Sequence, residues 1–252
     1  MASTGEDAAR ALRAGEVLRG RAPVEGSPRV AFLFPGQGSQ YRGMGAFLHR
    51  AEPEFRRAWD ACAAVVPELA GEVDLDHTRW TQPALFALEY ALAELWRSWG
   101  VVPDAVLGHS VGEFVAAAVA GVLAPVDAMR LVDARARLMG SLPAGGGMLA
   151  ATAPLPSIEP LLAGREVCVA AENGPADVVL AGRVDALAEI RTELEAAGHT
   201  ARPLAVSHAF HSPLMDPVLD EFEAAARPIE SRAPRIGLVT NRTGAFVEGA
   251  PG

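Results

Sequence analysis

The stretch Gly108-His-Ser-Val-Gly112 constrains the fold more than any other part of the chain. A short apolar run over residues 99–105 precedes it and predicts a buried strand, while the Ala-rich run over residues 111–120 predicts a helix. A serine between two glycines at a strand-to-helix turn is typical of a nucleophile elbow, although an ordinary glycine-rich loop is the alternative. The pattern predicts Ser110 as a nucleophile and the N–H of Val111 as an oxyanion donor.

Composition narrows the classes of protein that fit. The 252 residues allow one large domain or two small ones, and half of them are apolar. The net charge of −9 and the absence of a Lys/Arg-rich patch argue against nucleic-acid binding. Cys62 and Cys168 lie in different segments without metal-ligand spacing, so a disulfide framework is not expected. No 18-residue apolar run or signal peptide is evident, which favours a cytoplasmic protein without a membrane span.

Two kinds of unit alternate along the chain. A strand over residues 29–34 runs into a glycine-rich loop that carries Gln37, a candidate donor to a site, or simply a turn residue. Helices are expected over residues 8–18, 52–66, 83–99 and 126–139. Pro83 is expected in the first turn of the helix over residues 83–99. Residues 148–206 then read strand, helix, strand, strand, helix, strand, with the strands at 148–153, 167–171, 178–181 and 200–206 and the helices at 155–163 and 184–197. That order is typical of a ferredoxin-like unit, inserted here into a larger α/β domain.

The remaining segments complete a discontinuous organisation. A helix is expected over residues 214–226 and a last strand over residues 235–240. We therefore expect a linker or N-terminal extension over residues 1–28, a large subdomain over 29–141 and 207–252, and a small subdomain over 142–206. No helix or strand is expected after residue 244, which suggests a truncated C-terminus.

Histidine is the usual base for a serine nucleophile. His208 and His211 follow the strands and precede a helix, where hydrolase-like folds place the base. No acidic third member of a triad is evident, so a Ser–His dyad is the better hypothesis. Arg135 could clamp a substrate carboxylate, although a lone helix arginine more often lies on a solvated face. His109 adjoins Ser110 and is a candidate for supporting the site.

Several motifs in one order identify a family resemblance. Phe34-Pro-Gly-Gln-Gly-Ser-Gln40, Thr81-Gln-Pro-Ala-Leu-Phe86, Gly108-His-Ser-Val-Gly-Glu113 and His208-Ala-Phe-His211 occur in sequence. The chain resembles the acyltransferase domains of modular type I polyketide synthases and, more distantly, malonyl-CoA:acyl carrier protein transacylases. The resemblance covers about residues 29–244. It implies an α/β-hydrolase-like large subdomain with an inserted ferredoxin-like subdomain, and in family members the large subdomain continues with further helices.

The resemblance also implies roles for individual residues. Ser110 matches the nucleophile and His211 the base, with Gln37 and the Val111 amide as the oxyanion hole. Arg135 matches the arginine that pairs with the extender-unit carboxylate. His109, His208 and Phe210 match residues that line the substrate site, and Asn173 matches a turn of the small subdomain that faces the cleft. Phe210, in His-Ala-Phe-His, matches malonyl-selecting rather than methylmalonyl-selecting members.

These matches imply a ping-pong acyltransferase of polyketide or fatty-acid biosynthesis that needs no bound cofactor. Malonyl-CoA would be the donor, and the phosphopantetheine thiol of an acyl carrier protein the acceptor. Neighbouring polyketide synthase domains, a ketosynthase among them, are the other implied partners. Two rival hypotheses stay open. One is a serine acyl hydrolase of the editing type, and the other is a catalytically incomplete fragment with a docking role.

Overall fold

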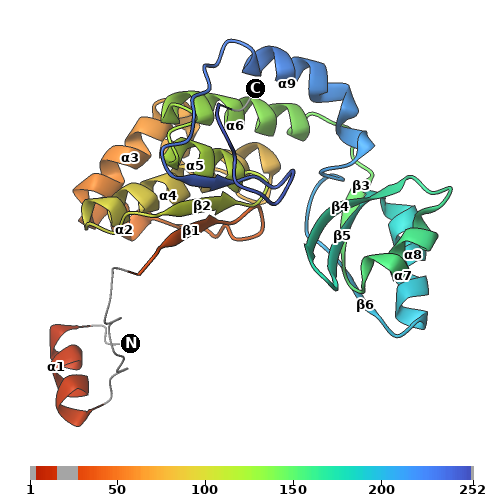
Figure 1. The fold of residues 1–252 in the computed structure, drawn as a ribbon, viewed down its shortest axis with the longest axis horizontal. Helices are drawn as coiled ribbons and strands as arrows, with labels where there is room; N and C mark the ends of the chain where they lie inside the picture. The colour runs from red at the N-terminus through yellow and green to blue at the C-terminus, as the bar shows by residue number, and fades with distance from the viewer. Residues whose placement is uncertain (1–3, 16–27, 251–252) are drawn as a thin grey trace.

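The computed structural model describes residues 4–15 and 28–250 (Figure 1). The helices are α1 (Gly5–Ala14), α2 (Ala46–Ala51), α3 (Pro53–Ala63), α4 (Thr78–Ser98), α5 (Gly112–Val119), α6 (Pro125–Gly140), α7 (Leu155–Leu162), α8 (Val184–Ala196) and α9 (Leu219–Ala226), with 3₁₀ turns η1 (Pro67–Ala70) and η2 (Pro213–Val218). The strands are β1 (Ala31–Phe34), β2 (Ala105–Gly108), β3 (Gly146–Thr152), β4 (Val167–Gly174), β5 (Asp177–Arg183), β6 (Thr200–Pro203) and β7 (Gly237–Val239). The expected linker lies, up to residue 27, outside the described residues.

The first sheet is parallel, with the strand order β1-β2-β7. Phe32, Val106 and Leu238 are aligned across its three strands, and the last two are almost fully buried. They pack in one core with residues of α4, α5 and α6, which lie together over the sheet in Figure 1. The alternating side chains of the strands point the other way, and Leu33 there is 69% exposed. The covered face therefore anchors the strand that leads into Ser110.

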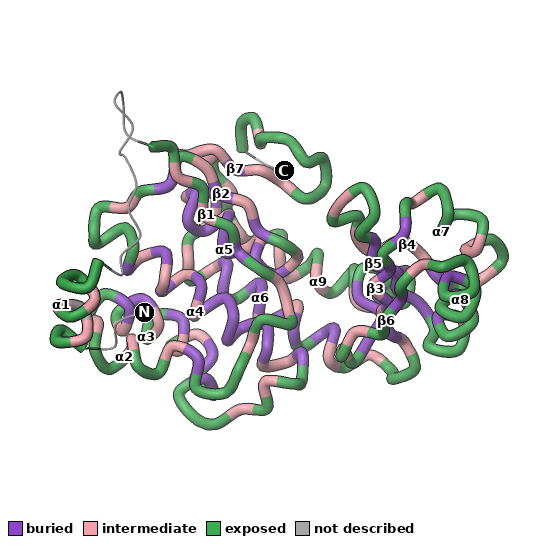
Figure 2. The backbone as a smooth tube through the Cα atoms, turned by 90° about the horizontal axis from the view of Figure 1, so that it is seen from below, coloured by how far each residue is buried: buried purple, intermediate pink, exposed green. Residues whose placement is uncertain are grey.

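The second sheet is antiparallel throughout, with the strand order β4-β5-β3-β6. In chain order this places the strands second, third, first and fourth, the arrangement of a ferredoxin-like unit with the two helices α7 and α8 packed on it. Leu149, Leu180 and Ile190 form its own buried core, which is separate from the first core in Figure 2. The predicted fold class, including the inserted unit, is confirmed.

The predicted positions of two elements along the chain are wrong. The strand expected over residues 99–105 is β2, Ala105–Gly108, because α4 continues to Ser98 and a left-handed Gly100 (φ 85°) then turns the chain. Pro83 is not in the first turn of its helix. Instead α4 begins at Thr78, where the His77 ring accepts a hydrogen bond from the N–H of Arg79 and caps the helix.

Smaller differences also have local causes. The first helix ends at Ala14 instead of Leu18, because Gly15 (φ 74°) caps it in a left-handed conformation. The single helix expected over residues 214–226 is divided into η2 and α9 beside Pro217. The short helices α2 and η1 were not predicted. These differences concern only where elements begin and end and two short additional helices. They leave the sheet to which each site motif is connected as expected.

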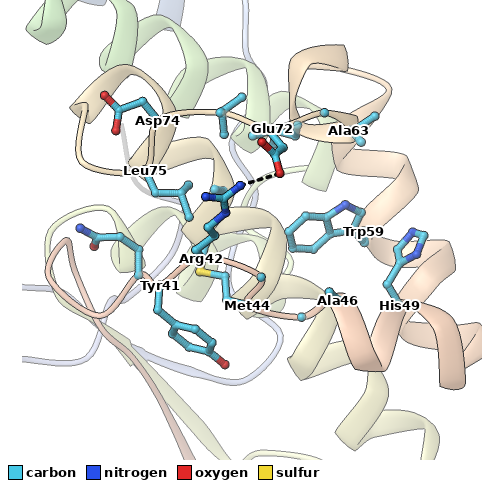
Figure 3. Close-up of a pocket in the computed structure, with 18 of the residues that line it drawn as sticks. Tyr41, Arg42, Met44, Ala46, His49, Trp59, Ala63, Glu72, Asp74 and Leu75 are labelled. Carbon is cyan, nitrogen blue, oxygen red and sulfur yellow. Dashed lines mark hydrogen bonds and ion pairs between the residues drawn. The ribbon is translucent and has the colours of Figure 1, made fainter.

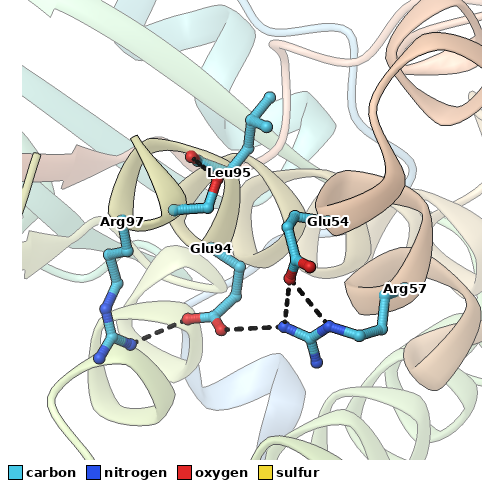
Figure 4. A network of polar contacts seen from close by, with 6 residues as sticks. Glu54, Arg57, Glu94, Leu95 and Arg97 are labelled. Atoms are coloured by element: carbon cyan, nitrogen blue, oxygen red, sulfur yellow. Dashed lines mark hydrogen bonds and ion pairs between the residues drawn. The ribbon is translucent and has the colours of Figure 1, made fainter. Parts of the chain in front are cut away.

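Charged side chains join α3 to α4 at the surface. Arg57 forms ion pairs with Glu54 on its own helix and with Glu94 on α4, and Arg97 also contacts Glu94 (Figure 4). Such exposed pairs each contribute less than about 1 kcal/mol, so the apolar contacts beneath them hold the two helices together. Within residues 4–15 and 28–250, no helix combines the length and the apolar character that crossing a bilayer requires.

Candidate active site

The turn between β2 and α5 places Ser110 at the carboxyl end of the parallel sheet. Ser110 has φ of 53°, in the left-handed region that residues other than glycine seldom adopt. The turn has no room for side chains at Gly108 and Gly112, the two glycines of the motif around Ser110. A Cβ on Gly108 would lie 2.0 Å from the backbone of Gly112, and one on Gly112 would lie 2.3 Å from the carbonyl oxygen of Phe34. The sharp turn thus presents the serine hydroxyl away from the sheet.

His211 lies in the segment that returns from the second sheet. Its Nε2 is 2.8 Å from Ser110 Oγ, and its φ of 60° is also left-handed. Burial lowers the pKa of His211 from 6.5 to about 4, and the positive charge of Arg135 and the neighbouring His109 act in the same direction. The imidazole is therefore neutral at physiological pH, and a neutral Nε2 can accept the serine proton.

Arg135 approaches Ser110 from α6. Its Nη2 is 3.2 Å from Ser110 Oγ, and its Nη1 donates to Oε1 of Gln82 on α4. Burial lowers the pKa of Arg135 to about 10, and the carboxylate of Glu113 opposes that shift, so the guanidinium stays positive. A fixed positive charge beside a nucleophile suits a substrate that carries a carboxylate.

The contacts of Gln82 continue to the glycine-rich loop. Gln82 Nε2 donates to Thr78 Oγ1 at 2.9 Å, and Thr78 Oγ1 donates to Gln37 Oε1 at 2.8 Å. Gln82 and Thr78 are both buried. One chain of hydrogen bonds therefore runs from Arg135 through α4 to Gln37, and it holds the side chains of the loop and of the arginine in fixed positions.

Two backbone N–H groups near Ser110 are without an acceptor in the residues that the structure describes. Gly36 packs against the turn so closely that a Cβ there would lie 3.0 Å from the carbonyl oxygen of His109. This contact brings the Gln37 loop beside Ser110. Within the described part of the chain, the N–H groups of Gln37 and Val111 donate no hydrogen bond, whereas the N–H of Ser110 donates to Asn241 Oδ1. Gln37 and Val111 therefore keep backbone donors for a ligand.

In the described part of the chain, none of the other residues named from the sequence forms a hydrogen bond with Ser110 Oγ. His109 is exposed beside Gly36. The ring nitrogens of His208 are 2.9 Å from the carbonyl oxygen of Leu142 and 2.8 Å from Ser207 Oγ. Phe210 is buried in a small apolar cluster with Met139 and Met215. Asn173 is exposed where β4 ends.

Sequence reasoning assigned no role to four residues that the structure brings to the site. Thr78 and Gln82 connect Arg135 to Gln37, as described above. Asn241 contacts the backbone on both sides of His109, and Glu113 contacts Asn241. Two of them, Gln82 and Glu113, lie inside the motifs quoted above, and Asn241 follows a strand at the carboxyl edge of a sheet, which is a usual place for functional side chains.

A cavity of about 950 Å³ lies elsewhere, between the loop after β1 and the helices α2 and α3. Arg42 and Glu72, both exposed, form an ion pair at 2.7 Å at this cavity, and Trp59 lies on another of its walls (Figure 3). None of the residues paired with Ser110 lines it. The candidate active site is therefore identified by its chemistry and not by the size of this cavity.

Comparisons with known proteins agree with this geometry. A sequence profile described as the acyl transferase domain matches residues 31–246. Mycoketide-CoA synthase of Mycobacterium tuberculosis is 47% identical in an alignment of 248 positions that covers 91% of this chain and 6% of that protein. The crystal structure of the acyltransferase domain from the second module of the salinomycin polyketide synthase is 48% identical, with a TM-score of 0.90 over 98% of this chain and 62% of its own.

A third similarity is to a complex of two proteins. A malonyl-transacylase solved with its type II polyketide synthase acyl-carrier protein is 32% identical to this chain, with a TM-score of 0.79. The match covers 88% of this chain and 77% of the solved chain. By contrast, the chain spans only 6% of the length of Mycoketide-CoA synthase and less than two thirds of the salinomycin structure.

Proposed function

The chain belongs to the acyl transferase domain family, and we propose that it moves a malonyl group from malonyl-CoA through Ser110 to the phosphopantetheine thiol of an acyl carrier protein. One observation carries this proposal. Ser110 Oγ lies within hydrogen-bonding distance of a neutral imidazole, 2.8 Å from His211 Nε2, and of a cationic guanidinium, 3.2 Å from Arg135 Nη2. A base and a carboxylate-binding group therefore meet at one nucleophile.

In the first half-reaction, Ser110 Oγ attacks the malonyl thioester carbonyl while His211 Nε2 takes the serine proton. The N–H groups of Gln37 and Val111 stabilise the oxyanion that forms on the carbonyl oxygen. The intermediate collapses by breaking the carbon–sulfur bond, and the leaving thiolate of coenzyme A takes the proton from His211. The product is a malonyl ester of Ser110.

In the second half-reaction, the phosphopantetheine thiol gives its proton to His211 and attacks the ester carbonyl. The carbon–oxygen bond breaks, and the serine oxygen takes the proton back from His211. Arg135 pairs with the free carboxylate of the malonyl group in both steps, and Gln82 keeps its guanidinium oriented. The enzyme ends each cycle unchanged, without a metal or bound cofactor in these steps.

Donor selectivity is part of the proposal. Phe210 directly precedes the base, and its buried ring fills the space beside Met139 and Met215. In this proposal Phe210 borders the acyl group bound at Ser110, where its ring leaves less room for a C2 methyl group. One methyl group is worth about 1–3 kcal/mol of discrimination. We expect malonyl-CoA to be preferred over methylmalonyl-CoA when the two compete for Ser110, and a methylmalonyl preference would contradict this assignment.

The relatives support the proposed partners of the reaction. The malonyl-transacylase seen with an acyl-carrier protein supports a carrier protein as acceptor, and the polyketide synthase relatives support neighbouring domains such as a ketosynthase. Exposed His109 and Asn173 and buried His208 are proposed to shape the approach to the site. A cytoplasmic location is also part of the proposal. It is supported by the two cysteines, Cys62 and Cys168, which are both free thiols.

Coenzyme A release separates transfer from hydrolysis. We expect a single turnover of release from malonyl-CoA alone and sustained turnover once a phosphopantetheine-bearing acyl carrier protein is added. Rapid sustained release with water as the only acceptor would support the acyl hydrolase instead. No release from a folded sample would support the docking fragment.

A further inference from the structure

We propose that Asn241 and Glu113 form a clamp that holds the turn around Ser110 in its reactive conformation, acting as positioning residues. The inference rests on the proposed function in one respect, the role of Ser110 as nucleophile. Neither residue contacts the hydroxyl of Ser110 directly in the described contacts, so both act through the backbone.

Asn241 binds the turn with both ends of its carboxamide. Oδ1 accepts the N–H of Ser110 at 3.1 Å, and Nδ2 donates to the carbonyl oxygen of Gly108 at 2.5 Å. A planar group that both donates and accepts thus spans the residue before the turn and the nucleophile itself. Because Ser110 has φ of 53°, its backbone is strained, and this conformation persists only where its surroundings hold it.

Glu113 fixes the clamp from the other side. Its Oε1 accepts the backbone N–H of Asn241 at 2.9 Å and Thr240 Oγ1 at 2.7 Å. Glu113 lies in the first turn of α5, three residues after the nucleophile, where a carboxylate also interacts favourably with the helix dipole. The loop after β7 is therefore tied to the helix that Ser110 precedes.

The clamp has a consequence for the oxyanion donors. Because Asn241 Oδ1 takes the N–H of Ser110, that amide is not available to a substrate oxygen. The next amide, that of Val111, keeps its donor. Asn241 therefore determines which backbone N–H faces the reacting carbonyl, and its loss would leave the wrong donor free and release the strained turn.

The test uses two acylating reagents on the full chain. A fluorophosphonate bonds its phosphorus to Ser110 Oγ and expels fluoride, so its labelling rate reports nucleophilicity without any acyl-CoA. Malonyl-CoA reports the proposed reaction. We expect Asn241→Ala to lower the maximal rate of both by about 10–100-fold while the half-saturating concentration of malonyl-CoA stays near that of the unchanged chain.

Conservative variants separate positioning from folding. Glu113→Gln retains an acceptor at Oε1 and should label within about threefold of the unchanged chain, whereas Glu113→Ala should label about 10-fold or more slowly. Arg242→Ala is the matched control, because it alters the next residue of the same loop, whose side chain makes none of these contacts. Thermal unfolding of each variant is measured alongside.

The outcomes are distinguishable. A folded Asn241→Ala that labels as fast as Arg242→Ala overturns the clamp. If Asn241→Ala does not fold, equal labelling of Glu113→Gln and Glu113→Ala overturns it instead. If the unchanged chain reacts with the fluorophosphonate and not with malonyl-CoA, the donor assignment fails, while slower labelling of Asn241→Ala still supports the clamp.

Discussion

At the scale of single residues, the environment of His211 sets the pH range of the reaction. Burial, with the charges of Arg135 and His109, keeps the pKa of His211 at about 4, below the 6.5 of a free imidazole. The base form therefore predominates above about pH 4. We expect the second-order rate of acylation, which reports the free enzyme, to fall on the acid side near pH 4 instead of near pH 6.5.

A variant of Arg135 tests the cause of that shift. Removing the guanidinium in Arg135→Met takes away one of the effects that lower the pKa of His211, so the acid limb should move upward, although burial still holds it below 6.5. The lowered pKa of His211 also determines how the stability of the folded state changes with pH. Since the folded state binds the proton more weakly, His211 makes folding less favourable as the pH falls from about 6.5 to about 4. An acid limb that does not move in the variant would argue against this account.

Arg135 should also determine which acyl groups are accepted. In Arg135→Ala, malonyl transfer should fall by about 10–100-fold, because a charged hydrogen-bonded pair with the carboxylate is lost, whereas transfer of an acetyl group should change much less. Arg137→Ala is the control, because Arg137 is exposed on the same helix two residues later. Equal losses for malonyl-CoA and acetyl-CoA would contradict a carboxylate-binding role.

At the scale of elements, α4 carries an unusual buried acid. Glu89 is 6% exposed, and within the described residues no group donates to either carboxylate oxygen. Burial raises its pKa from 4.5 to about 8, so the folded state retains a proton that the unfolded state releases between those values. Stability from this group is therefore present below about pH 4.5 and is lost as the pH rises through about 8.

Denaturant unfolding at several pH values tests this sign. Relative to the unchanged chain, Glu89→Gln should gain stability steadily between pH 4.5 and pH 8, because a neutral amide has no proton to lose. Glu89→Met should be more stable at pH 8 by roughly 1–3 kcal/mol, since it removes unpaired polar atoms from the core. A pH-independent difference between Glu89→Gln and the unchanged chain would contradict a buried, protonated carboxyl.

Elements also show where sequence patterns are informative. The order of strands and helices correctly predicted the inserted ferredoxin-like unit. Pro154 directly before α7 and Gly198 shortly after α8 mark where its two helices begin and end. Residues 99–105 were misplaced as a strand because they form the end of α4 and the loop before β2, in which the apolar side chains of Trp99 and Val102 are exposed. Apolar character alone does not separate these cases.

At the scale of the whole molecule, the site joins segments that are distant in sequence. Chain order and residue type suggested Ser110 and left His208 and His211 open as its base, and the family resemblance pointed to His211 and Arg135. The structure brings the side chains of Ser110, His211 and Arg135 together. Gln82 and Asn241 depend on the packing of α4 and β7 against the turn, which no local pattern encodes. The exact subdomain boundaries at residues 141–142 and 206–207 stay predictions.

The second sheet directly contacts the segment that carries His211. A Cβ on Gly146 of β3 would lie 2.7 Å from the backbone nitrogen of Ala209, and Cys168 Sγ of β4 lies 3.6 Å from the carbonyl oxygen of His211. We expect Gly146→Ala to displace this segment and slow acylation by about 10-fold or more, with the core around Val106 intact. Gly71→Ala, where the nearest atom would be 3.6 Å away, is the control.

The most direct measurement is the intact mass of the chain after incubation with malonyl-CoA, beside Ser110→Ala and His211→Ala. The account predicts one malonyl adduct on the unchanged chain, none on Ser110→Ala, and formation slowed by about 100-fold or more on His211→Ala. A folded chain that gains no adduct, or an adduct that persists in Ser110→Ala, would contradict the proposed acyl-enzyme.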